Sequence, residues 1–222
     1  MVTGVSSGAP LAPFAFLGPK YDAAHARLAL GTELRDPFGV RPVHNLIRYR
    51  ALGSGEPLKQ LLDREINEEV LADLRQAHQE GRRLFIATAN LKTRRLVTWD
   101  LGAIACSGRP DADALVRKLL LAACSFQGVS PPVTFDVEVD GRCYQEEHSD
   151  AGPVATAFLR FGPMPSWPAP GSGATGWLAG SNLYLLASGP LYPPTLSGPL
   201  GLVKTLLARS TASLSSLNRS NA

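Results

Sequence analysis

Gly4-Val5-Ser6-Ser7-Gly8 runs directly into an apolar segment over residues 9–17. A serine flanked by glycines at this spacing has the form of a nucleophile elbow, a sharp strand-to-helix turn that lifts the serine oxygen clear of a sheet. The flanking glycines keep side chains from colliding, and the turn aims the backbone N–H of Ser7 at a developing oxyanion. Short motifs have many false matches, but the helix predicted over residues 7–16 supplies the context that an elbow requires.

The rest of the chain alternates between helical and extended patterns. Helices are predicted over residues 7–16, 21–30, 67–81, 111–124 and 200–217, and strands over residues 84–89, 96–99, 133–139, 142–144 and 182–187. Asp140-Gly141 predicts a hairpin turn. Residues 31–56 are interpreted as loop, and residues 162–180, with nine prolines and glycines, as a flexible excursion. The alternation predicts an α/β protein with a largely parallel sheet.

Composition argues against a nucleic-acid partner. The net charge is only +3, and the only tight basic pairs are Arg82–Arg83 and Arg94–Arg95. A protein that neutralises phosphates normally concentrates its basic charge on one face. Because 45% of the residues are hydrophobic and 18% charged, the composition favours a globular core rather than disorder.

The cysteines predict neither a disulfide framework nor a metal site. Cys106, Cys124 and Cys143 form no CxxC pair, so we interpret them as small buried hydrophobic residues and expect no metal and no cofactor. The chain has no apolar run of about 20 residues, and Met1 is not followed by the pattern of a signal peptide. We therefore expect a soluble protein, cytoplasmic or peripheral to a membrane, with its compartment unknown.

A nucleophilic serine needs a base, and five side chains near predicted strand ends are candidates: Asp100, Asp136, Asp140, His148 and Asp150. Asp140 is best explained as a hairpin residue, Asp136 as an outward-facing strand residue, and Asp100 as a turn or cap residue. His148 could complete a serine–acid–histidine triad with Asp100 or Asp136. Spacing alone leaves this alternative open, because geometry defines a triad.

Several further segments occur in the order found in the patatin-like phospholipase family of bacterial type, which the chain resembles. These segments are residues 4–8, 11–19, 81–91, 97–105, 128–132 and 144–152, with a fainter match at 183–187. The resemblance implies a three-layer α/β sandwich with a mostly parallel central sheet. It also implies hydrolysis of lipid or phospholipid esters by a serine–aspartate dyad without histidine, through an acyl-enzyme, and adds peripheral membrane contact as an expectation.

By this resemblance Ser6 is the nucleophile and Asp150 the general base, while Gly4, Ser7 and Gly8 form the elbow and contribute to the oxyanion site. The chain departs from the family at Ala151, where the family has glycine after the aspartate. If the backbone there required a positive φ, the methyl group would be unfavourable.

A second departure is the glycine-rich loop that the family carries upstream of its serine. The chain begins three residues before the elbow, and we expect a single domain over residues 1–222 that is truncated at both ends. Losing one oxyanion donor costs about 2.7–4 kcal/mol in the transition state, so weak or undetectable turnover is expected.

The alternative hypothesis is a non-catalytic remnant that binds lipid or a partner through exposed apolar residues. Phe14, Phe16 and Leu17 are the candidates for such a surface, although an apolar stripe after an elbow is more often core.

Overall fold

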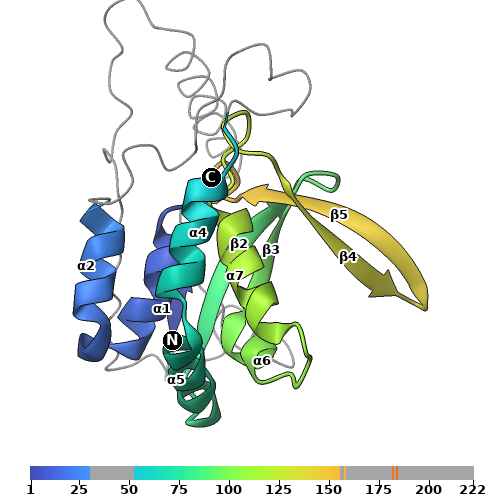
Figure 1. Cartoon of the computed structure of the whole chain (residues 1–222). Coiled ribbons are helices and arrows are strands. Elements are labelled where there is room, and N and C mark those ends of the chain that lie inside the picture. The colour runs from blue at the N-terminus through green and yellow to red at the C-terminus, as the bar shows by residue number, and fades with distance from the viewer. Residues whose placement is uncertain (31–52, 156–157, 159–181, 183, 185–222) are drawn as a thin grey trace, which may run out of the picture. The chain divides into compact units, whose positions relative to one another are not determined.

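The computed structural model describes residues 1–30, 53–155, 158, 182 and 184 (Figure 1). The chain divides into two compact units, Met1–Phe158 and Leu159–Ala222, and the description below concerns the first. The excursion at 162–180, the helix at 200–217 and nearly all of the strand at 182–187 lie outside the described residues. Those expectations, like the single domain over 1–222, remain predictions.

Five strands form one sheet. They are β1 (Val2–Gly4), β2 (Leu84–Asn90), β3 (Arg95–Asp100), β4 (Val133–Val139) and β5 (Arg142–Asp150). The order is β1-β2-β5-β4, and β3 pairs with β2. Since β2 pairs with β3 along nearly its whole length, β1 and β5 must share its other edge, one after the other.

The α/β class is confirmed, but the described strand pairing differs from a mostly parallel sheet. The β1–β2 pair is parallel, whereas the β2–β3, β2–β5 and β4–β5 pairs are antiparallel. The physical reason is connection length. A parallel pair needs a crossover of about a dozen residues or more, and the links from β2 to β3 and from β4 to β5 are short turns.

The described residues also form helices. They are α1 (Gly8–Leu17), η1 (Pro19–Tyr21), α2 (Asp22–Leu30), α4 (Glu56–Glu65), α5 (Glu68–Gln79), α6 (Leu101–Ala105) and α7 (Ala112–Ala123). The predicted helices at 7–16, 21–30, 67–81 and 111–124 are confirmed. Two helices were not predicted: α4, whose Leu58, Leu61 and Leu62 are buried, and the five-residue α6.

Local signals in the sequence explain the best-predicted helix. Asn67 precedes α5 in an extended conformation, and its side chain accepts a hydrogen bond from Val70 N at 3.1 Å. Glu68 and Glu69 lie at the positive end of the helix dipole. After the helix, Gly81 adopts φ +90°, which glycine tolerates without strain.

The core lies between the helices and the sheet. All seven residues of β2 are buried, which is typical of a strand covered on both faces at the centre of an α/β fold. Phe14 and Phe16 of α1 are each 1% exposed and belong to this core. The hypothesis of a membrane- or partner-facing surface is therefore wrong for Phe14 and Phe16, and Leu17 is partly buried against the same core.

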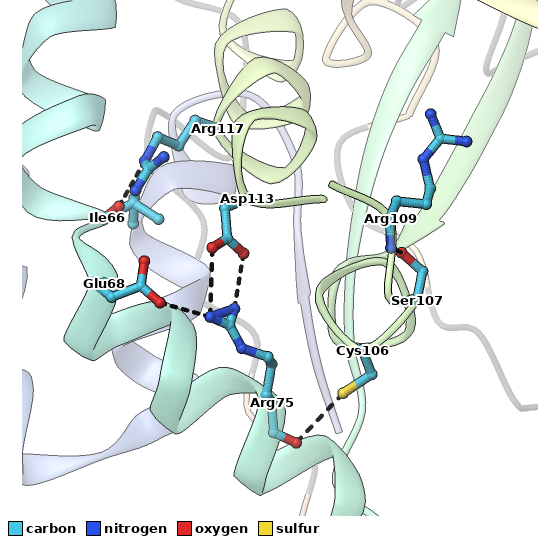
Figure 2. A network of polar contacts seen from close by, with 8 residues as sticks. All are labelled: Ile66, Glu68, Arg75, Cys106, Ser107, Arg109, Asp113 and Arg117. Carbon is cyan, nitrogen blue, oxygen red and sulfur yellow. Dashed lines mark hydrogen bonds and ion pairs between the residues drawn. The ribbon is translucent and has the colours of Figure 1, made fainter. Parts of the chain in front are cut away.

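A polar network ties the helices together at the periphery of the core (Figure 2). Arg75 of α5 bonds to Asp113 of α7 and to Glu68, with closest distances of 2.8 Å. Arg117 of α7 donates to the carbonyl of Ile66 at the end of α4, also at 2.8 Å. These contacts fix α7 against α4 and α5, and the C-terminal end of α7 reaches the site described next.

Candidate active site

The site forms where two strands meet end to end on one edge of β2. Running parallel to β2, β1 ends with Gly4 opposite Ile86. From the other direction β5 arrives antiparallel and ends with Asp150 opposite Thr88. A single position of β2 separates the two strand ends, so Ser6, which follows β1, becomes a neighbour of Asp150, 144 positions further along the chain.

The segment after β1 has the geometry of an elbow. Ser6 adopts φ +52°, a conformation that non-glycine residues seldom take, and α1 begins two residues later. The turn is closed by bonds of 2.9 Å from Gly8 N to Val5 O and from Ala9 N to Ser6 O. An added Cβ on Gly4 would lie 2.8 Å from Ala9 Cα, so only glycine lets the helix approach the strand this closely.

The elbow points the Ser6 side chain at the end of β5. Ser6 Oγ donates a hydrogen bond to Asp150 Oδ2 at 2.6 Å. The other carboxylate oxygen, Oδ1, accepts a bond from the backbone N–H of Gly152 at 2.6 Å. Both oxygens are therefore engaged, and the carboxylate has a fixed orientation toward Ser6.

Burial sets the electrostatics of Asp150, which is 2% exposed. Desolvation raises the pKa of the carboxyl, and the hydrogen bonds from Ser6 and Gly152 oppose that rise only in part. A carboxylate with a raised pKa is a stronger base than a solvated aspartate, which is the property that a general base needs.

The residues that follow α7 make hydrogen bonds to both sides of the site. Asp150 N donates to Ser125 O at 2.9 Å, and the Cys124 thiol donates to Ser6 O at 3.3 Å. Burial raises the pKa of Cys124, and the charge of Asp150 raises it further, so Cys124 remains a thiol donor. No local pattern identifies the roles of Cys124 and Ser125, because both contact the site from a helix end whose position depends on tertiary packing.

The residues after Asp150 explain how the chain departs from the family pattern. Ala151 is fully buried and does not have a positive φ, so its methyl group causes no backbone strain. The requirement for glycine falls instead on Gly152, where an added Cβ would lie 3.1 Å from Asp150 Oδ1 and 3.7 Å from Ser6 Oγ. In the sequence, the spacing Asp150-x-Gly152 is the signal that could have identified this glycine.

The structure places His148 in a separate polar chain. Its Nδ1 lies 2.8 Å from Thr88 Oγ1 and its Nε2 lies 3.1 Å from Glu146 Oε2. Thr88 Oγ1 also accepts a hydrogen bond from Trp99 Nε1 at 2.7 Å, so the chain runs from Trp99 through Thr88 and His148 to Glu146. Both ring nitrogens of His148 are thus engaged away from Ser6.

The remaining acidic candidates have structural roles. Asp100 caps α6 by accepting a bond from Ala103 N at 2.9 Å. Asp136 accepts from Gln145 across the β4–β5 pair at 3.1 Å. Asp140 takes φ +52° beside Gly141 in the hairpin turn, as the sequence predicted.

The residue that precedes α1, Ser7, follows Ser6 directly in the chain and has a free backbone donor among the described residues. Ser7 is exposed, and its backbone N–H bonds to no acceptor among the described residues. Gly8, the last glycine of the motif, has no atom within 4 Å of a built Cβ. A helix N-terminus carries partial positive charge, so this corner of the site is suited to a developing negative charge.

The described residues contain neither a candidate metal site nor a candidate membrane-spanning helix. Within the described residues no group of three or more His, Cys, Asp or Glu side chains could hold a metal ion. None of the described helices is long and apolar enough to cross a membrane.

The structure thus has an α/β fold with a serine at a positive-φ turn beside a buried carboxylate, and comparison with known proteins identifies the family. The family model for "Patatin-like phospholipase" matches residues 1–155. The chain belongs to this family, which comprises lipid hydrolases, and the match includes both Ser6 and Asp150. No curated protein matches the chain.

Proposed function

We propose that the protein hydrolyses carboxylic esters of lipids, with Ser6 as nucleophile and Asp150 as general base. The observation that carries this proposal is the 2.6 Å hydrogen bond from Ser6 Oγ to Asp150 Oδ2, made by a serine on a positive-φ elbow. A nucleophile and a base within bonding distance, with the base held by a third group, is the arrangement that activates a hydroxyl.

In the first half-reaction Ser6 Oγ attacks the ester carbonyl carbon as its proton passes to Asp150 Oδ2. The tetrahedral intermediate then collapses: the bond to the leaving alcohol breaks, and the proton on Asp150 passes to that oxygen. In the second half-reaction Asp150 takes a proton from water as the water oxygen attacks the acyl-enzyme carbonyl. The bond between the acyl carbon and Ser6 Oγ then breaks, and the proton on Asp150 passes to Oγ, which releases the fatty acid and restores Ser6.

Two features support stabilisation of the intermediate. The Ser7 N–H lacks an acceptor among the described residues, and the start of α1 adds its dipole to the same corner. One such donor is worth about 2.7–4 kcal/mol in the transition state. The Gly152 N–H does not contribute there, since it is used to hold Asp150.

The test is labelling of the full chain by a fluorophosphonate, which reacts with activated serines. We expect labelling of the wild-type protein, none in Ser6→Ala, and a fall of about 10²–10⁴-fold in rate in Asp150→Asn. Ser7→Ala is the matched control, because it removes the neighbouring hydroxyl and keeps the backbone N–H. Labelling that persists in Ser6→Ala, or that disappears in Ser7→Ala but not in Ser6→Ala, would disprove the assignment. Release of fatty acid from a short-chain ester and from phosphatidylcholine then tests the substrate class.

A further inference from the structure

We propose that the turn between β2 and β3 docks the protein on an anionic lipid surface through Lys92, Arg94 and Arg95. The inference rests on the proposed function in one respect: it names the surface from which Ser6 would take its substrate. We call residues 91–95 the basic turn.

The first observation is that, among the described residues, the cations of the basic turn have no partner. Of the fourteen described lysines and arginines, ten have a partner, whether a carboxylate, a carbonyl or an aromatic ring. These ten are Lys20, Arg27, Lys59, Arg64, Arg75, Arg82, Arg83, Arg109, Arg117 and Lys118. Three of the remaining four, all exposed, lie within four residues of one another. Charges that take no partner in the described part of the fold are available to one outside it.

The second observation is that the backbone holds the basic turn in one conformation. The buried side chain of Asn90 accepts bonds from Lys92 N and Thr93 N, both at 3.0 Å. Arg94 takes φ +57° and donates its N–H to Asn90 O at 2.8 Å. An ordered turn presents its cations without the entropic cost of ordering a loop on binding.

The third observation is the position of the basic turn relative to the site. Thr88 lies opposite Asp150, and β2 continues past it for two residues before the turn begins. At about 3.3 Å per residue the turn lies about 10–15 Å beyond the level of Asp150. Figure 1 shows the turn at the upper end of the sheet, where the β5 arrow also ends. A surface that contacts the basic turn therefore faces the end of the sheet that carries Ser6.

The basic side chains of the turn indicate a partner that carries phosphate groups. Lysine and arginine bind phosphate groups, lysine as a point charge and arginine as a bidentate donor. Each basic residue near an anionic bilayer strengthens binding about fivefold, so three together are expected to contribute about 100-fold. On the adjacent strand, Glu146 is engaged by His148 at 3.1 Å, which reduces its competition for these cations.

The experiment measures sedimentation of the full chain with lipid vesicles at low salt, in a Ser6→Ala background so that no hydrolysis alters the lipid. Vesicles of phosphatidylcholine are compared with vesicles that also contain phosphatidylglycerol. We expect binding only to the anionic vesicles, weakened by added salt, and about 100-fold weaker binding in Lys92→Gln/Arg94→Gln/Arg95→Gln. The control Lys59→Gln/Arg109→Gln/Arg142→Gln removes the same charge elsewhere, including the far end of the β4–β5 hairpin, and is expected to bind like the parent.

Equal binding to both vesicle types, or equal loss in the two triple variants, overturns the proposal. Melting curves of both variants show whether each has folded, since all six substituted side chains are exposed. If the fluorophosphonate does not label the wild-type protein, but the protein still binds anionic vesicles through the basic turn, the proposed hydrolase activity is refuted and the docking surface is retained. The reverse result leaves the hydrolase and removes the docking surface.

Discussion

The two glycines of the elbow motif, identical in sequence terms, are expected to respond oppositely to alanine. In Gly4→Ala the new methyl carbon would lie 2.8 Å from Ala9 Cα, 2.8 Å from Gly8 O and 2.9 Å from Ala12 Cβ. Two of these atoms belong to the backbone of α1, so the helix must move as a unit. Overpacking of this kind costs about 1–3 kcal/mol. At Gly8 nothing lies within 4 Å and the φ is not positive, so alanine should stabilise by about 0.4–1 kcal/mol through the unfolded state.

Thermal unfolding followed by circular dichroism measures both effects. At about 2–4 °C per kcal/mol for a protein of this size, we expect a Tm lower by roughly 2–12 °C in Gly4→Ala and higher by roughly 1–4 °C in Gly8→Ala. Fluorophosphonate labelling should also fall in Gly4→Ala, because movement of α1 carries Ser6 away from Asp150. If Gly8→Ala destabilises as much as Gly4→Ala, the close approach of strand and helix at Gly4 is not what the motif requires.

Two further predictions concern buried polar groups. Labelling should require ionised Asp150, so its rate should rise with pH through a pKa that burial has raised above the ordinary aspartate range. Because the pKa of Asp150 is higher in the folded state than in the unfolded state, the folded state binds more protons between those two pKa values. The free energy of unfolding of the wild-type protein should therefore fall relative to that of Asp150→Asn as pH rises through this range. Parallel plots of unfolding free energy against pH for the two proteins would refute this prediction. Thr88→Val leaves Trp99 Nε1 and His148 Nδ1 without their partner, which should cost about 1–3 kcal/mol each in urea unfolding. Thr88→Ser should restore most of that loss, and a valine variant as stable as wild type would contradict the hydrogen-bond assignment.

Local signals predicted the elements well and their pairing poorly. The helix caps at Asn67 and Asp100 and the Asp140-Gly141 turn depend on neighbours in sequence, and the structure shows them as expected. Strand direction was misjudged because the alternation of helices and strands was taken as a sign of parallel crossovers. No helix is predicted over α4, because the interpretation of residues 31–56 as loop treats Gly53 and Gly55 as breakers and assigns no element to the residues that follow. Proline is tolerated in the first turn, where Pro57 lies.

For the site, the sequence identified the residue types and the resemblance selected among them. From spacing alone, Asp100, Asp136, His148 and Asp150 remained candidates, and nothing in their order distinguished a base from a cap. Geometry distinguishes them, because a cap, a cross-strand bond or a polar chain accounts for each of the first three. The support from Cys124 could not be predicted, since it depends on where the end of α7 lies in three dimensions.

The location of Asp150 follows from competition for one edge of β2. Residues 84–86 of that edge are taken by β1 and residues 88–90 by β5, so β5 cannot extend past Thr88. The chain must leave the sheet at Asp150, and the turn that follows brings the Gly152 N–H back onto the carboxylate at 2.6 Å. The same limit applies to β1, which must turn away after Gly4 and does so through the positive φ of Ser6. Ser6 and Asp150 thus lie on the two sides of one junction, which is why a serine with a positive φ and a buried carboxylate occur together there.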